Sequence, residues 1–220
     1  GRAEIYGIML DGKGGVTVDN VALRGSGGLI FSSIAPEVME EGFREMNTRL
    51  VILQFGGNAM PGIRSGKGIS AYVRKMVRDF EYFKKVAPHT RIMFIGPADM
   101  SKSVDGKRVT WPLLPQLNDS LRVKCLENGV AYWDTFKVMG GSGSMNQWVN
   151  HNPALAGPDH IHFTYRGAEE IGKAMSRSFL AYYDFYKLRA SIPEDAVKNF
   201  MAPDSLTAAN DSLSINKDAP

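Results

Sequence analysis

The sequence predicts an α/β fold in which a mostly parallel β-sheet lies between helical layers. Apolar runs without alternation, such as 50–55 and 91–96, are typical of strands buried on both faces of a parallel sheet. Segments with apolar residues at helical spacing follow these runs. Strands and helices alternate through most of the chain, as they do in α/β proteins.

The first half of the chain is expected to hold three strands and two helices. Residues 4–10 and 16–24 are rich in β-branched and aromatic side chains and are separated by a glycine-rich turn. Apolar residues at helical spacing predict a helix over 35–47, and the continuous apolar run at 50–55 predicts a buried strand. The apolar stripe over 65–86 predicts a long amphipathic helix.

The second half continues the same alternation. A buried strand is expected at 91–97, a helix over 113–128 and a further strand at 130–135. Residues 140–158 are rich in glycine, serine and asparagine, so we expect a loop there. The last helix is expected over 165–189, and we expect its apolar stripe to pack into the core: Ile171, Met175, Phe179, Tyr182 and Tyr186.

Length and composition indicate an ordinary globular protein. The 220 residues are enough for one large domain, which we place at 1–190, while the polar residues 191–220 are expected to form a C-terminal tail. The net charge of +3 is small and scattered, which argues against a nucleic-acid partner. No run of about 18 apolar residues is present, so no membrane span is expected. Cys125 is the only cysteine, which excludes an internal disulfide, and it is expected to be a buried hydrophobe.

Three polar breaks are expected at one edge of the sheet. They are Gly25-Ser26, Gly56-Gly57-Asn58 and the segment from Asp159 to His162. Ligands of parallel sheets bind at the carboxyl ends of the strands. The first break is neither a Gly-x-Gly-x-x-Gly motif nor a lysine-bearing phosphate loop, which argues against a nucleotide site.

These breaks contain groups that acyl transfer requires. A carboxylate three residues before an imidazole can orient the ring and stabilise its charged form, so Asp159 and His162 are candidates for a general base and its partner. The side-chain N–H of Asn58 and the backbone N–H of Gly25 suit an oxyanion hole.

The order and spacing of these breaks resemble the SGNH (GDSL-type) hydrolases. Arg24-Gly25-Ser26 resembles the second block of that family, Gly56-Gly57-Asn58 the third and Asp159-x-x-His162 the fifth, over about residues 16 to 189. The resemblance implies a flavodoxin-like three-layer α/β/α sandwich that hydrolyses esters, often acyl groups on carbohydrates. It also implies Gly25 and Asn58 as oxyanion donors, His162 as the base and Asp159 as its partner.

The sequence departs from the family at two places. Ala59 stands where the family commonly has an acid, and the Gly-Asp-Ser block with the nucleophilic serine is absent. The chain begins at Gly1 without an initiator methionine, so we expect the strand and its serine upstream of Gly1. Ser26 is the alternative nucleophile within the chain. Two other hypotheses stay open: an inactive carbohydrate- or partner-binding module on the same scaffold, and a binding domain for a phosphorylated ligand.

The remaining expectations concern the surroundings of the site. Gly57, Trp148 and His160 are expected to line the pocket. His160 and His162 have a spacing known from metal ligands, but no second ligand cluster accompanies them, so neither a metal nor a cofactor is expected. The expected substrate is a small acyl ester or an acylated carbohydrate, and the expected location is the bacterial periplasm or the medium.

Overall fold

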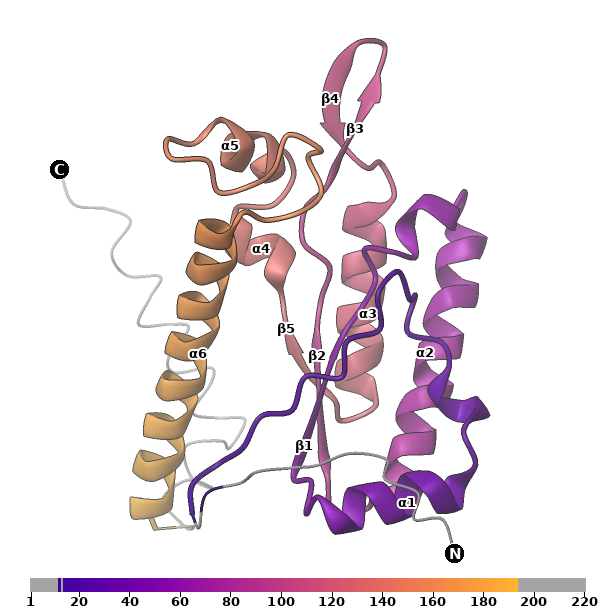
Figure 1. Ribbon diagram of the computed structural model, residues 1–220, viewed down its shortest axis with the longest axis vertical. Coiled ribbons are helices and arrows are strands. Elements are labelled where there is room, and N and C mark those ends of the chain that lie inside the picture. The colour runs from indigo at the N-terminus through magenta and orange to yellow at the C-terminus, as the bar shows by residue number, and fades with distance from the viewer. Residues whose placement is uncertain (1–11, 13, 194–220) are drawn as a thin grey trace, which may run out of the picture. The chain divides into compact units, whose positions relative to one another are not determined.

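The computed structural model describes residues 12 and 14–193 and contains a three-stranded β-sheet (Figure 1). The strands are β1 (Leu50–Gln54), β2 (Arg91–Ile95) and β5 (Ala131–Trp133), in the order β1-β2-β5. β1 and β2 pair in parallel, with Leu50 opposite Arg91. Helices α2 (Gly66–Val86) and α3 (Leu114–Glu127) connect the strands, so the predicted α/β fold class is confirmed.

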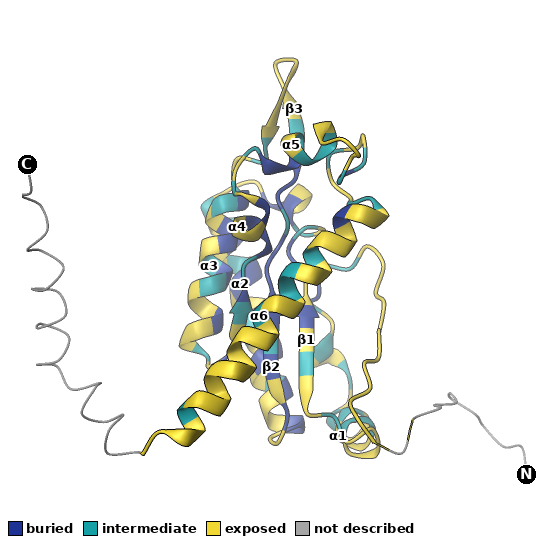
Figure 2. Ribbon diagram, turned by 90° about the vertical axis from the view of Figure 1, so that its left-hand side faces the viewer, coloured by how far each residue is buried: buried dark blue, intermediate teal, exposed yellow. Residues whose placement is uncertain are grey.

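Packing of α2 against the sheet builds the core beside β2 (Figure 2). The Ser65 hydroxyl accepts a hydrogen bond from the Gly68 N–H and caps the helix start. Apolar residues at helical spacing then form the buried face of α2: Ile69, Val73, Met76, Phe80 and Phe83. The ring of Phe80 meets Phe94 of β2 edge-on at 6.0 Å between centroids. The predicted long helix and the predicted buried strand therefore pack together.

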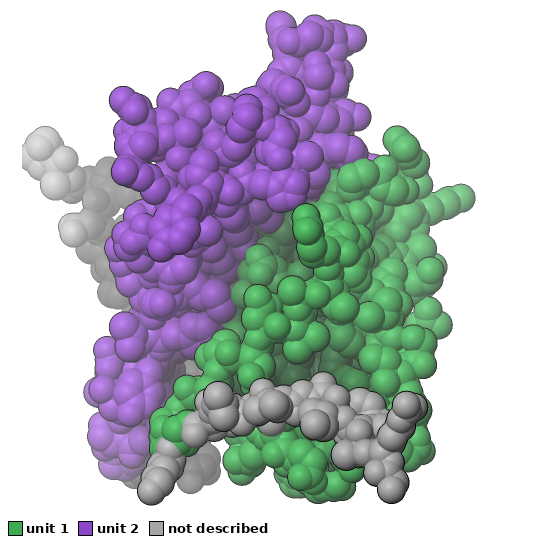
Figure 3. Space-filling view, in the orientation of Figure 1, with its two compact units in different colours: residues 1–97, 116–132 green, residues 98–115, 133–220 purple. Residues whose placement is uncertain are grey.

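The chain forms two compact units, which Figure 3 colours separately. Unit 1 comprises Gly1–Pro97 and Gln116–Tyr132, and unit 2 comprises Ala98–Pro115 and Trp133–Pro220. Besides the elements above, unit 1 contains α1 (Pro36–Glu45) and two short 3-10 helices, η1 (Phe31–Ser33) and η2 (Met60–Gly62).

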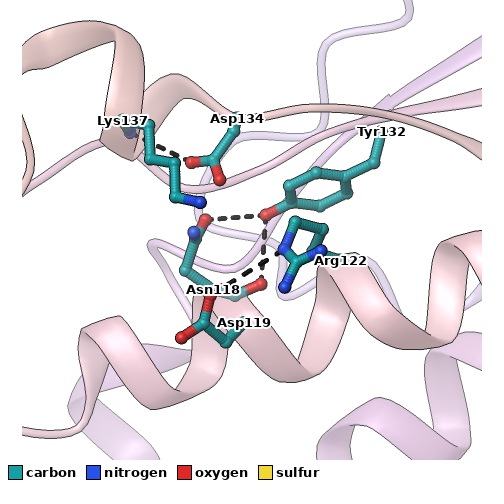
Figure 4. Close-up of polar contacts among 6 residues, drawn as sticks. All are labelled: Asn118, Asp119, Arg122, Tyr132, Asp134 and Lys137. Atoms are coloured by element: carbon teal, nitrogen blue, oxygen red, sulfur yellow. Dashed lines mark hydrogen bonds and ion pairs between the residues drawn. The ribbon is translucent and has the colours of Figure 1, made fainter. Parts of the chain in front are cut away.

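Gly96, which follows β2, lies close to Tyr132 of β5 within unit 1, and Figure 4 shows Tyr132 beside Asn118 of α3. The Tyr132 hydroxyl donates a hydrogen bond of 2.7 Å to the side-chain oxygen of Asn118, which is buried on α3. A Cβ at Gly96 would overlap the Tyr132 hydroxyl. Glycine at this position therefore allows the chain to leave β2 beside a buried polar pair.

The described part of unit 2 contains a β-hairpin and three helices. The hairpin consists of β3 (Ser101–Val104) and β4 (Lys107–Thr110), which pair antiparallel. The helices are α4 (Thr135–Met139), α5 (Ser144–Asn150) and α6 (Tyr165–Ser191). Met139, Met145 and Ala156 are buried at the centre of a small apolar cluster in this unit.

Two expectations about the N-terminal part differ in outcome. The strand expected at 16–24 is wrong: these residues form no strand, and Val16 and Val18 are 92% and 86% exposed. A β-rich segment becomes a strand only where a neighbouring strand satisfies its backbone groups, and none pairs with it among the described residues. The strand expected at 4–10 lies outside the described residues.

The loop expected at 140–158 is wrong in part, because α5 occupies its first half. The buried Asp99 side chain accepts a hydrogen bond of 2.8 Å from the Met145 N–H and so stabilises the start of this helix. Asp99 is distant in sequence, which explains why local composition did not predict the helix.

The apolar stripe of α6 is not core along its whole length. Ile171 and Met175 are half-buried, whereas Phe179, Tyr182 and Tyr186 are exposed, so the expectation is wrong for these three residues. The indole N–H of Trp133 donates to the Ser178 hydroxyl at 3.1 Å, and residues 179–188, which follow this point, are all exposed. A helical period identifies a face of the helix but not the partner that buries it.

Other expectations concern single features of the chain. Cys125 is fully buried, as expected, and burial raises the pKa of its thiol to about 12. Among the described residues, no helix has the length and apolar character needed to cross a membrane. The domain at 1–190 and the tail at 191–220 stay predictions, and 194–220 lie outside the described residues.

Candidate active site

Asp159 and His162 form a hydrogen-bonded pair at the start of the last loop before α6. His162 Nδ1 lies 2.7 Å from Asp159 Oδ2. The other carboxylate oxygen accepts the backbone N–H groups of Ile161 and His162 at 3.0 and 3.1 Å. The Asp159 carboxylate thus stabilises the turn through two backbone N–H groups and orients the His162 ring through its second oxygen.

The protonation of this pair follows from the hydrogen bonds. The bond from the His162 side chain, followed by those from the backbone, lowers the pKa of Asp159 to about 2. Asp159 is therefore ionised at neutral pH and can only accept, so His162 Nδ1 carries the proton. With Nδ1 as the donor, a neutral ring has a free lone pair on Nε2. The His162 side chain is 77% exposed, so the ring is accessible to a substrate.

Short-range backbone bonds close the loop around this pair. The Gly157 N–H donates to the His162 carbonyl at 2.8 Å, and the His160 N–H donates to the Gly157 carbonyl at 3.0 Å. Ala156 and Phe163 form an isolated antiparallel bridge at the loop base. His160 has a φ of 59°, a left-handed conformation that turns the chain between Asp159 and His162.

His160 and Trp148 support the loop from within unit 2. Nδ1 of His160 lies 2.9 Å from the side-chain oxygen of Asn146 on α5, and its carbonyl accepts the Ser101 N–H at 2.9 Å. The Trp148 ring packs against Phe163, with 5.4 Å between ring centroids. His160 thus lies within the His162 loop, and Trp148 packs against its base. That His160 and Trp148 line a pocket stays a prediction.

The Gly25 turn lies in unit 1. The Ser26 N–H donates to the Leu23 carbonyl at 3.2 Å, and Gly25 has a φ of +71° in this turn. Within the described part of the chain, the Gly25 N–H donates to no protein acceptor. The Ser26 hydroxyl accepts the Gly28 N–H at 3.0 Å, which is the role of a turn residue.

The Asn58 loop lies directly beside this turn. The Asn58 side-chain amide donates to the Ser26 carbonyl over a long 3.4 Å, and the side chain is exposed. Gly28 packs against the Phe55 ring so closely that a Cβ would overlap it. Gly57 follows Gly56 in the same loop and has open space around its Cα.

The structure therefore brings two of the three predicted breaks together, Gly25-Ser26 and Gly56-Gly57-Asn58, within unit 1. The Asp159–His162 pair belongs to unit 2. That all three breaks serve one site stays a prediction.

Three supporting residues escaped the sequence analysis. The Tyr72 hydroxyl donates 2.8 Å to the Gly27 carbonyl and holds the Gly25 turn onto α2. Asn146 joins His160 to the Arg108 carbonyl of β4. Gly167 lies against the Leu155 carbonyl, where a Cβ would overlap it. Only Gly167 had a local signal, since a glycine in the first turn of a helix is unfavourable without a packing reason.

Two observations bear on metal and ligand sites elsewhere in the molecule. In the part of the chain that the structure describes, no group of three histidine, cysteine or acidic side chains could hold a metal ion. A groove of about 1010 Å³ lies between α2 and α3, and none of the candidate site residues lines it.

The chain resembles known proteins in its structure but not detectably in its sequence. No family model and no curated protein matches the sequence. A solved structure of a peptidoglycan O-acetylesterase is similar, with a TM-score of 0.61 and 22% identity over 72% of this chain and 44% of that one. An acetyl xylan esterase, AlAXEase, has a TM-score of 0.45 and 16% identity over 62% of this chain and 71% of that one. The periplasmic domain of a lipopolysaccharide acetyltransferase from Salmonella ser. Paratyphi A has a TM-score of 0.44 and 14% identity over 64% of this chain and 60% of that one.

The first of these similarities establishes a shared fold. The chain spans less than half the length of that acetylesterase structure. The chain therefore has the α/β scaffold found in a known acetylesterase, together with a hydrogen-bonded Asp159–His162 pair on an accessible loop.

Proposed function

We propose that this chain is part of an SGNH-type serine ester hydrolase that removes acyl groups from carbohydrates. The observation that carries the proposal is the 2.7 Å contact between Asp159 and His162, with the ring accessible to a substrate. The fold shared with an acetylesterase supports it. The proposed location is the periplasm or the medium, and cell fractionation tests it.

In the proposed reaction, His162 Nε2 takes the proton of a serine hydroxyl as the serine oxygen attacks the ester carbonyl. Asp159 stabilises the imidazolium, and the Gly25 N–H and Asn58 amide donate to the oxygen that becomes negative. The intermediate then breaks its bond to the sugar oxygen, which takes the proton from His162. Water releases the acyl group from the serine by the same steps.

The nucleophile is proposed to lie upstream of Gly1, at the end of an additional strand that pairs with β1. Among the described residues only β2 pairs with β1, so one edge of β1 is open. Leu50 and Ile52 of β1 are 41% and 40% exposed, which is unusual for apolar residues on an open edge. An additional strand would satisfy the open edge. Ser26 is the less favoured nucleophile because its hydroxyl already accepts the Gly28 N–H.

The test compares hydrolysis of p-nitrophenyl acetate by protein that includes the residues upstream of Gly1 and by its His162→Ala variant. We expect the variant to lose at least about 10³-fold in kcat, because the serine then has no base. His151→Ala is the matched control, since His151 is exposed in the same unit and, among the described residues, its ring has a hydrogen bond only to the Pro153 carbonyl.

Two results would contradict the proposal. Activity retained in His162→Ala would remove the base from the mechanism. An inert protein that still binds glycans would favour a binding module on the same scaffold.

A further inference from the structure

The β3–β4 hairpin has two chemically different faces. Its register places Lys102 opposite Val109 and Val104 opposite Lys107. Directly opposite residues of an antiparallel pair share a face, and successive residues alternate between faces. Trp111 follows β4, and its backbone N–H donates to the Met100 carbonyl at 3.0 Å. This bond extends the pairing of the hairpin by one residue on each side, so the alternation of faces continues to Trp111. One face, here named the lysine face, therefore carries five residues: Lys102, Val104, Lys107, Val109 and Trp111.

Hydrogen bonds fasten the hairpin to the segments that support His162. The N–H of the buried Ser101 donates to the His160 carbonyl at 2.9 Å, two residues before His162. The Asn146 amide donates 2.9 Å to the Arg108 carbonyl, and the Gly143 N–H donates 2.7 Å to the Thr110 hydroxyl. The hairpin is thus attached to the loop of the candidate base within unit 2.

Three of the five residues of the lysine face are exposed, while Lys102 and Trp111 are half-buried. Val104 and Val109 are each 38% exposed, and Lys107 is exposed near the turn. The Lys102 ammonium lies 5.3 Å from the centre of the Trp111 ring. Figure 1 shows the hairpin projecting beyond α5 of the same unit, and Figure 2 shows its tip exposed.

This combination of groups fits an acidic sugar chain. An aromatic ring and small apolar side chains suit the C–H faces of sugar rings, since they present apolar surface with a fixed orientation. Lysine ammonium groups pair with carboxylates or sulfates as point charges. Nucleic acid is less favoured, because only two cations lie on this face and duplex binding depends on many phosphate contacts.

We propose that the lysine face binds an acidic polysaccharide and so sets the substrate class of the esterase. The link between this binding and ester hydrolysis rests on the proposed function. The binding itself can be measured in a protein that has no esterase activity.

The test is a titration of the 220-residue chain with oligogalacturonate and with a neutral xylo-oligosaccharide of matched length. We expect the acidic oligomer to bind more tightly, and added salt to weaken its binding by screening. The Lys102→Gln/Lys107→Gln variant should bind it about 3- to 10-fold more weakly, as exposed charge pairs contribute modestly. Lys75→Gln/Lys85→Gln on α2 makes the same change in charge and should bind like the wild type.

A second variant tests the apolar part of the face. Val109→Ser leaves every charge in place, and we expect it to weaken binding of both oligomers. Circular dichroism checks that each variant is folded.

Several results would overturn the inference. They are equal affinity for the acidic and neutral oligomers, equal losses in the two double variants, or equally tight binding of a single-stranded oligonucleotide. Selective binding by a protein that hydrolyses no ester would leave the inference standing and contradict the proposed function. Hydrolysis that depends on His162, without selective binding of the acidic oligomer, would support the proposed function and overturn the inference.

Discussion

The two loops that carry the candidate residues are held in place by different means. In the loop around His162, Asp159 bonds to residues two and three positions later, and Gly157 bonds to His162. In the Gly25 turn, Tyr72 and Asn58 hold the chain from positions more than thirty residues away. The Asp159–His162 pair is held mainly by bonds within its own loop, whereas the Gly25 turn is also held by residues distant in sequence.

This difference explains why one motif is readable and the other is not. Asp159 accepts bonds from its own turn and orients the His162 ring three residues later, so these contacts form between residues that are close in the sequence. The glycine-rich turn has only two short-range bonds of its own, from the Ser26 N–H to the Leu23 carbonyl and from the Gly28 N–H to the Ser26 hydroxyl, and glycine restricts the backbone least. Its shape depends on the helix and strand against which it packs.

The largest expected effect concerns the local loop. Asp159→Asn keeps an oxygen that can accept the two backbone N–H groups, so the turn should persist. The loss of charge removes the group that fixes the His162 tautomer, and kcat should fall by about 10³- to 10⁴-fold. The measurement is p-nitrophenyl acetate hydrolysis by the protein that includes the upstream residues.

Asp184→Asn is the control for that change, because Asp184 is an exposed acid on α6 paired only with Lys187. Its rate should match the wild type. A decrease smaller than about tenfold in Asp159→Asn would mean that the carboxylate does not orient the base.

A smaller effect is expected at the loop base. In Gly167→Ala the new methyl group would overlap the Leu155 carbonyl, and we expect a loss of about 2–4 kcal/mol in the free energy of unfolding. Gly172→Ala on the same helix meets no atom within 4 Å and should stabilise the protein by about 0.5–1 kcal/mol. Urea unfolding measures both. Equal changes in the two variants would contradict the close approach at Gly167.

The smallest effect tests the tertiary support of the Gly25 turn. Tyr72→Phe removes the donor to the Gly27 carbonyl, and we expect a loss of about 0.5–1.5 kcal/mol in the free energy of unfolding. The amide resonances of Gly25 and Gly27 should also shift. Tyr165→Phe, at a tyrosine 87% exposed, should change neither quantity. An unchanged turn in Tyr72→Phe would show that the turn is as self-sufficient as the His162 loop.

Most of the regular elements could be predicted from sequence because their signals are local. The helix predicted over 65–86 matches α2, and the one predicted over 165–189 matches α6 to within two residues. The predicted strand at 50–55 matches β1. Apolar period and capping residues act over a few positions and need no knowledge of the fold.

The β3–β4 hairpin was missed although a local signal existed. Asp105-Gly106 has φ angles of 49° and 76°, as a tight hairpin turn requires, and Asp-Gly is a strong signal for such a turn. The flanking strands are short and rich in lysine and serine, so their pattern did not resemble a strand. The hairpin is held by bonds to His160 and Asn146 that no local pattern reveals.

The sequence by itself determined the α/β class, the long helices and the pairing of Asp159 with His162, because each depends on residues close together along the chain. Only the tertiary structure decided that 16–24 forms no strand, that Phe179 and Tyr186 are exposed, and that Tyr72 holds the Gly25 turn. These outcomes depend on which surfaces meet. The hydrophobic effect rewards burial by any available partner, so a pattern can specify an apolar face but not what covers it.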